Sequence, residues 1–239
     1  MLVSRQHRIA FAHYPKTAGT SLQRWFIESF SDSTLLLPDN PHLDVASSMK
    51  VMQPNKWQRE ITRLQQHSLR LVSPTLAAQY GPWQTSLQVI GVMRDPFEML
   101  VSLFEFWQRV PFAIEPTDAF IGYARHGCFR DFLAAAVIGG RVPNYKQFFN
   151  VGGPLWHNTR LLDFESLKPA LDVVSVDFGV LNPRPLPELN RSLRGQRNLD
   201  CYRDEAGPLM AEVHRHFRWY YEEGVHLMIR GKEPLRAAA

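Results

Sequence analysis

Cysteine, long apolar runs and a targeting signal are scarce or absent in the 239-residue sequence. The two cysteines, Cys128 and Cys201, are too few for a disulfide framework or a cysteine-rich zinc site, so we expect two reduced thiols. The longest apolar stretches, such as 132–140, fall short of the roughly 18–20 residues that a membrane helix needs. Residues 1–8 carry positive charge, but no apolar core and cleavage site follow them. The sequence therefore predicts a cytoplasmic protein without stable membrane insertion.

Lysine is also scarce: six of the 27 basic residues are lysine, and the other 21 are arginine. The planar guanidinium fork suits phosphate and sulfate, so this excess fits an anionic ligand, although a GC-rich genome explains it equally well. The basic residues are scattered rather than gathered into a tail, so we predict no nucleic-acid partner. No histidine, cysteine and carboxylate spacing typical of a metal site occurs, which predicts metal-independent chemistry.

The order of apolar and polar segments indicates one α/β domain over residues 1–239. Apolar runs at 8–14 and 87–93 predict buried strands, and each leads through a short loop into a segment with helical spacing of large apolar residues. Further short strands are predicted near 34–37 and 160–164. This alternation favours a central parallel sheet flanked by helices on both faces, in which ligands bind beyond the carboxyl ends of the strands.

The loop after the first long strand has the composition of a phosphate-binding turn. Its small residues let backbone N–H groups approach an anion, its hydroxyls add donors, and the following helix directs its positive end at the same place. It lacks the glycine-rich run that precedes the lysine of a Walker loop. The alternative is an ordinary turn with threonine or serine capping the helix. The candidate anion-binding residues are Lys16, Thr17, Ala18, Gly19, Thr20 and Ser21.

A second motif follows the strand at 87–93. Arg94-Asp95-Pro96 leaves the strand end, and Ser102 lies two helical turns into the next predicted helix. Arg94 is suited to grip a phosphate with its fork while Ser102 donates from the helix. Taken alone, this motif fits a local salt bridge and a proline at a helix start equally well.

Together the two motifs resemble the sulfotransferases that use 3′-phosphoadenosine 5′-phosphosulfate (PAPS), in particular the carbohydrate and heparan sulfate 2-O type. In that family a Pro-Lys-Thr-Ala/Gly-Gly-Thr-Ser loop grips the 5′-phosphosulfate, and an Arg-Asp-Pro motif with a serine eight residues after the arginine grips the 3′-phosphate. Arg94 and Ser102 keep this spacing. Residues 158–167 resemble a later strand of the family, and residues 186–192 resemble its Leu-Pro-x-x-Asn-x-Ser loop, which adds Arg191 and Ser192 to the cofactor-binding set.

The resemblance implies a P-loop-containing nucleotide-binding fold and in-line transfer of a sulfuryl group from PAPS to a hydroxyl or amine, with PAP, the 3′,5′-bisphosphate, as product. The expected acceptor is a carbohydrate or glycoconjugate, no metal is expected, and Lys16 would stabilise the bridging oxygen. The family often has a second arginine near the position of Glu98 and Met99, so either the 3′-phosphate loses a contact here or Arg191 or Arg194 supplies it. The alternatives are a non-catalytic PAP-binding member and a P-loop kinase.

The resemblance does not fix the base that deprotonates the acceptor. His42 follows a turn and precedes a predicted helix, which is the context of the base in small family members. His67 is a rival by its distance from Arg94, and a carboxylate such as Asp44 or Glu28 is a further alternative. We expect His13, which precedes the loop, to be structural.

The acceptor pocket is expected within residues 111–155. Four aromatic residues there are candidates for stacking on sugar rings, although the hydrophobic core is the favoured place for them. They are Phe112, Tyr123, Tyr145 and Phe148. Neither the acceptor nor the oligomeric state follows from the sequence.

Overall fold

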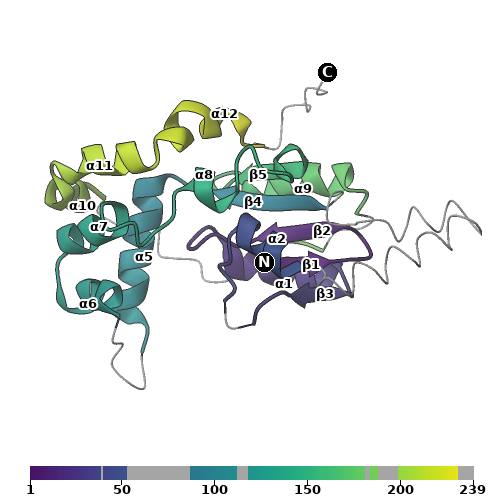
Figure 1. Cartoon of the computed structure of the whole chain (residues 1–239), viewed down its shortest axis with the longest axis horizontal. Coiled ribbons are helices and arrows are strands. Elements are labelled where there is room, and N and C mark those ends of the chain that lie inside the picture. The colour runs from purple at the N-terminus through teal and green to yellow at the C-terminus, as the bar shows by residue number, and fades with distance from the viewer. Residues whose placement is uncertain (39, 53–86, 112–117, 181–183, 188–198, 231–239) are drawn as a thin grey trace, which may run out of the picture.

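The computed structural model describes residues 1–38, 40–52, 87–111, 118–180, 184–187 and 199–230 (Figure 1). Within them the chain forms a five-stranded sheet of order β3-β1-β2-β4-β5 between layers of helices. The strands are β1 (Leu2–Ser4), β2 (Ile9–Ala12), β3 (Ser33–Leu35), β4 (Gln88–Met93) and β5 (Thr159–Asp163).

The sheet is mixed, so the prediction of a parallel sheet was wrong for its N-terminal edge. Strands β2, β4 and β5 run parallel, whereas β1 pairs antiparallel with both β2 and β3. The cause is local, because only residues 5–8 connect β1 to β2, and so short a connection forms a hairpin rather than a crossover. Arg8 takes a left-handed conformation at the end of this turn, with φ of 55°.

Helices cover both faces of the sheet, as the sequence predicted. Alternate strand residues such as Ile9 and Phe11 pack against α1 (Gly19–Ser29) and α9 (Leu167–Asp177). The other strand face, which includes Ala10, packs in a second cluster with α2 (Val45–Met52) and the later helices. This alternation is the two-residue period of strands that are buried on both sides.

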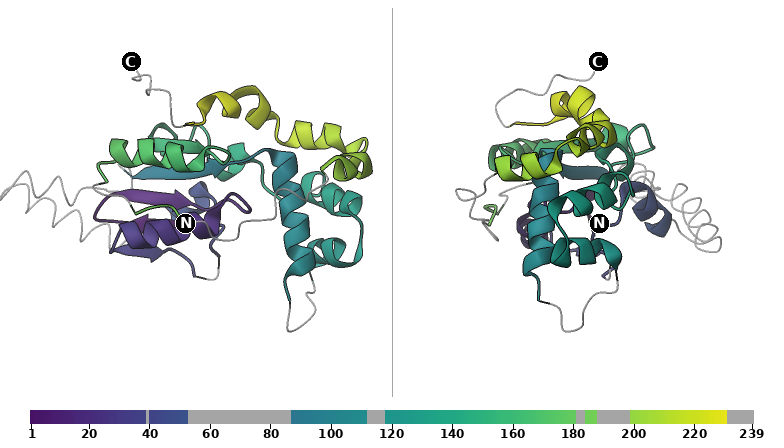
Figure 2. Two further views of the ribbon diagram at one scale, coloured as in Figure 1. Left: turned by 180° about the vertical axis from the view of Figure 1, so that it is seen from behind. Right: turned by 90° about the vertical axis from the view of Figure 1, so that its left-hand side faces the viewer.

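A group of helices extends the molecule beyond the carboxyl end of β4 (Figure 1). Figures 1 and 2 show α5, α6 and α7 grouped beside this end of the sheet, with α10 and α11 packed against them. The further bounds are α2 (Val45–Met52), α5 (Pro96–Arg109), α6 (Ala119–His126), α7 (Phe129–Val137), α8 (Tyr145–Phe148), α10 (Leu199–Ala206), α11 (Leu209–His216), a π-helical turn (Tyr220–Gly224) and α12 (Val225–Leu227). In the part of the chain that the structure describes, no helix is both long and apolar enough to cross a membrane.

Candidate functional site

Three adjacent parallel strands bring the predicted motifs to one edge of the sheet. Ala12 of β2 pairs with Gly91 of β4, and Met93 of β4 pairs with Asp163 of β5. The loop containing Lys16 and the Arg94 motif therefore leave from neighbouring strand ends. This is the edge at which parallel α/β sheets bind ligands.

The loop after β2 is held in an unusual backbone conformation. Lys16 and Ala18 both have φ of 60°, in the left-handed region that is unfavourable for residues other than glycine. Thr17 is buried between them, and its hydroxyl donates a hydrogen bond to the Tyr14 carbonyl at 2.9 Å. Such strained residues persist where the surrounding structure holds them, and they cluster at ligand-binding sites.

The N-terminus of α1 does not have the threonine or serine cap that the alternative interpretation required. The residue at the N-cap position is Ala18, which makes no side-chain capping bond. The positive end of the helix dipole therefore points out of the same loop that carries Lys16. This arrangement suits an anion better than an ordinary capped turn does.

Gly19 is required at the start of α1 because the ring of His13 packs directly on it. A Cβ atom at position 19 would lie 1.5 Å from Nε2 of His13, which is far inside van der Waals contact. His13, which we expected to be structural, thus covers the first turn of α1. The contact links the end of β2 to the helix that follows the loop.

His13 also contacts His42, the predicted base. The two ring centroids lie 4.3 Å apart, and Nδ1 of His42 lies 3.1 Å from the carbonyl oxygen of His13. Because a carbonyl oxygen only accepts, Nδ1 carries the hydrogen, and Nε2 of the neutral ring is the proton acceptor. His42 itself is exposed, in the turn before α2.

The surroundings of both histidines favour the neutral imidazole. Burial, and after it the positive charges of His42, the N-terminus and Lys16, lower the pKa of His13 to about 3. Loss of hydration also lowers the pKa of His42 below its usual range, and the N-terminus and Lys16 act in the same direction. The hydrogen bond to the His13 carbonyl opposes this shift in the pKa of His42 but does not reverse it. Both rings are therefore neutral near pH 7.

The structure gives the two alternative carboxylates other contacts. Oδ1 of Asp44 accepts a hydrogen bond from the Ser47 N–H at 2.8 Å and caps α2. Glu28 pairs with Arg24 in the last turn of α1, about 13 Å along the helix from Gly19. The rival base His67 lies outside the described residues.

Arg94 is a buried charge at this edge, with 5% of its side chain exposed. Its Nη2 lies 2.9 Å from Oε2 of Glu98, and its guanidinium carbon lies 4.5 Å from the ring centroid of Phe164. Its Nε is buried and has no hydrogen-bond partner among the described residues. The salt bridge expected under the alternative interpretation thus exists, but a buried guanidinium donor is still left without an acceptor.

The helix that begins at this motif also contacts the loop after β2. Asp95 caps α5 by accepting a hydrogen bond from the Glu98 N–H at 3.0 Å. Farther along α5, the ring of Phe106 lies 4.2 Å from the ammonium of Lys16. Ser102, between them, is 6% exposed and belongs to the buried side of α5. Thus α5 contacts or carries three of the predicted cofactor-binding residues.

The backbone of Arg94 is held by a residue that the sequence did not place at the site. The hydroxyl of Tyr145 accepts a hydrogen bond from the Arg94 N–H at 3.2 Å and donates one to the Arg94 carbonyl at 2.8 Å. Tyr145 and Phe148 are buried core residues, as favoured, whereas Tyr123 is 44% exposed. Phe112, Arg191, Ser192 and Arg194 lie outside the described residues.

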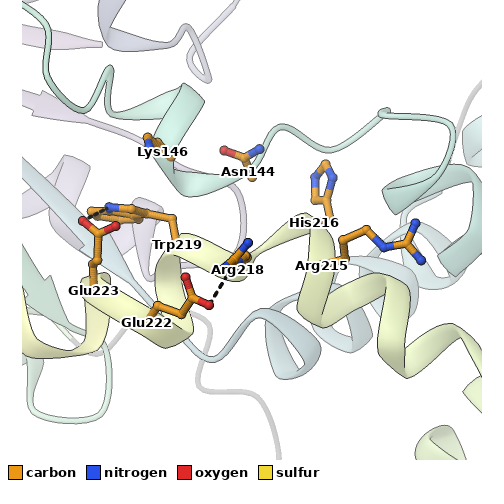
Figure 3. Close-up of a pocket in the computed structure, with 8 residues that line it drawn as sticks. All are labelled: Asn144, Lys146, Arg215, His216, Arg218, Trp219, Glu222 and Glu223. Atoms are coloured by element: carbon orange, nitrogen blue, oxygen red, sulfur yellow. Dashed lines mark hydrogen bonds and ion pairs between the residues drawn. The ribbon is translucent and has the colours of Figure 1, made fainter.

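A separate hollow of about 320 Å³ lies between α8 and the C-terminal helices (Figure 3). Several of its polar groups already bind one another or the backbone. Arg218 pairs with Glu222 at 2.7 Å, the Trp219 ring N–H donates to Glu223 at 3.1 Å, and His216 contacts the Val142 carbonyl. It contains none of the predicted site residues. Its lining residues are Asn144, Lys146, Arg215, His216, Arg218, Trp219, Glu222 and Glu223.

The described residues contain no group of three histidine, cysteine, aspartate or glutamate side chains placed to hold a metal ion. Comparison with protein-family models, curated proteins and solved structures found no match to this chain. The assignment of the site therefore depends on its residues and their geometry.

Proposed function

We propose that the protein is a sulfotransferase that moves the sulfuryl group of PAPS to a hydroxyl or amine of a carbohydrate or glycoconjugate. One observation carries this proposal. Two anion-binding candidates follow adjacent carboxyl ends of parallel strands. One is the loop with Lys16 and Ala18 in the left-handed conformation, and the other is the buried Arg94, whose Nε has no partner among the described residues. The motif resemblance supplies the chemistry, since a nucleotide with phosphate groups on both sides of its ribose needs two separate anion sites.

The residues present fit such a nucleotide. Lys16, the loop amides and the N-terminus of α1 would hold the 5′-phosphosulfate, because all three contribute positive charge or N–H donors. Arg94 would hold the 3′-phosphate, which supplies an acceptor for its buried Nε. Bound in this way, PAPS supplies an activated sulfuryl group. The P-loop-containing fold that the resemblance implies belongs to this same proposal.

The remaining steps are assigned to residues of the chain. Nε2 of His42 accepts the proton of the acceptor group as the new sulfur–oxygen or sulfur–nitrogen bond forms. As the bond from sulfur to the bridging oxygen broke, the ammonium of Lys16 would stabilise the negative charge left on PAP. Lys16 would then exchange its contact with the ring of Phe106 for the anion, because a phosphate is the stronger partner for an ammonium.

The test is transfer of labelled sulfuryl from PAPS to a pool of glycan acceptors by the purified protein. We expect metal-independent turnover, and Lys16→Ala lowers kcat and kcat/KM together because its charge acts mainly in the transition state. Lys168→Ala, an exposed lysine on α9, is the matched control and retains wild-type rates.

Two results would contradict this function. PAP binding without transfer to any acceptor would indicate a non-catalytic member, and magnesium-dependent use of ATP would indicate a kinase. A Lys16→Ala enzyme with a raised KM and an unchanged kcat would reduce Lys16 to a binding residue.

A further inference from the structure

Tyr145 makes an unusual pair of hydrogen bonds in the core. Its hydroxyl binds both backbone polar groups of Arg94, accepting from the N–H at 3.2 Å and donating to the carbonyl at 2.8 Å. The residue is 1% exposed, and burial raises the pKa of its hydroxyl far above the usual range. The hydroxyl therefore stays protonated near neutral pH and can donate a hydrogen bond.

The same tyrosine ring contacts the end of the neighbouring strand. Its centroid lies 4.5 Å from that of Tyr14, whose carbonyl accepts the hydrogen bond from the Thr17 hydroxyl. Lys16 lies between Tyr14 and Thr17 in the loop. Tyr145 thus contacts the starting points of both anion-binding motifs, one through its ring and the other through its hydroxyl.

We propose that Tyr145 is a positioning residue that fixes Arg94 relative to the loop after β2, and so sets the site's preference for a nucleotide with a 3′-phosphate. This inference rests on the proposed function. The physical reason is that Arg94 follows the last residue of β4, where the ladder to β5 ends and no strand among the described residues pairs with its backbone. Tyr145 replaces that partner, so the guanidinium leaves the sheet edge in one direction.

Other groups around Arg94 do not perform this function. Glu98 and Phe164 contact the side chain and orient the guanidinium only after the backbone is placed. Removal of the Tyr145 hydroxyl leaves two buried backbone groups unpaired, which favours displacement of the Arg94 peptide. The expected loss of binding affinity is therefore confined to ligands that carry the 3′-phosphate, which Arg94 would hold.

The experiment compares Tyr145→Phe with wild type by calorimetric titration with PAP and with adenosine 5′-monophosphate, which differ only in the 3′-phosphate. We expect the ratio of the dissociation constant of the monophosphate to that of PAP to fall about tenfold or more, with the affinity for the monophosphate unchanged. Tyr202→Phe is the matched control, because its hydroxyl bonds Glu105 on α5 rather than Arg94, and it retains the ratio. An unchanged ratio in Tyr145→Phe, or equal losses for both ligands, would overturn the inference.

A second substitution keeps the test decisive if Tyr145→Phe does not fold. Incorporation of 3-fluorotyrosine at position 145 leaves the ring in place, but it weakens the hydroxyl as an acceptor from the Arg94 N–H and strengthens it as a donor to the Arg94 carbonyl, so the ratio shifts by a smaller amount. An unchanged ratio with this residue would overturn the inference. If the wild-type protein showed no preference for PAP over the monophosphate, the 3′-phosphate site itself would be contradicted, and the proposed function with it.

Discussion

Nδ1 of His42 lies 3.1 Å from the carbonyl oxygen of His13, and the two rings are 4.3 Å apart. The hydrogen bond fixes the tautomer of His42, and the neutral ring of His13 packs beside it without adding a charge of its own. A neutral imidazole with Nε2 as acceptor is the form that general-base catalysis requires. The pair therefore holds His42 in the tautomer that the proposed base requires, which its sequence context alone could not establish.

Replacement of His42 by glutamine should remove the base and leave the phosphate contacts intact. We expect turnover to fall about 10²- to 10⁴-fold while PAP still binds. In wild type, the lowered pKa keeps the ring neutral to more acidic pH, so the acidic limb of the kcat profile has its midpoint below about 6.5. The measurement is kcat against pH for both proteins.

His157→Gln, an exposed histidine of the 3₁₀ turn before β5, is the control and should leave the profile unchanged. His67, the alternative base, is tested in the same series, and His67→Gln should leave kcat nearly unchanged. If His67→Gln were inactive while His42→Gln remained active, the base would be His67.

The pH dependence of stability should report His13. Its pKa is about 3 in the folded protein and about 6.5 when unfolded, so between these values the unfolded chain binds the additional proton. The contribution of His13 to the free energy of unfolding is therefore fully present above about pH 6.5. It decreases as the pH falls below this value, by at most about 1.4 kcal/mol per pH unit. Urea denaturation at pH 7.5 and 5.0 measures the difference. His13→Asn should reduce it, and an undiminished pH dependence in that variant would show that other groups cause it.

Gly19→Ala should destabilise the protein because the added methyl group overlaps the ring of His13. Overpacking of this kind typically costs about 1–3 kcal/mol. The double variant Gly19→Ala/His13→Ala should recover most of that loss relative to His13→Ala alone, which gives a coupling energy between the two positions. Gly122→Ala on α6, where a Cβ meets no atom within 4 Å, is the control and should be neutral or slightly stabilising. Additive losses at positions 19 and 13 would contradict the contact.

Local patterns were sufficient to predict the long elements of the sheet and the edge where the motifs meet. The apolar runs at 8–14 and 87–93 contain β2 and β4, because a strand buried on both faces is a short continuous apolar run. The three-residue strand β1 was not predicted, since it is too short to show a period. Its antiparallel pairing is what makes the sheet mixed.

The contacts that complete the site could not be predicted, because they join segments far apart in the chain. Tyr145 is 51 residues from Arg94, and its burial was expected while its hydrogen bonds were not. Similarly, His13 was expected to be structural, but its contacts with Gly19 and His42 depend on where the turn before α2 returns to the sheet edge. No sequence period encodes such pairings.

The most direct test of the two-ended anion site is a calorimetric titration with PAP and with adenosine 5′-phosphosulfate, which lacks the 3′-phosphate. We expect wild type to bind PAP at least about tenfold more tightly, and Arg94→Gln to abolish this difference while both ligands still bind through the Lys16 loop. Glu28→Gln, in an exposed ion pair of α1, serves as the control. Equal affinities of wild type for the two ligands would contradict the assignment of Arg94 to a 3′-phosphate.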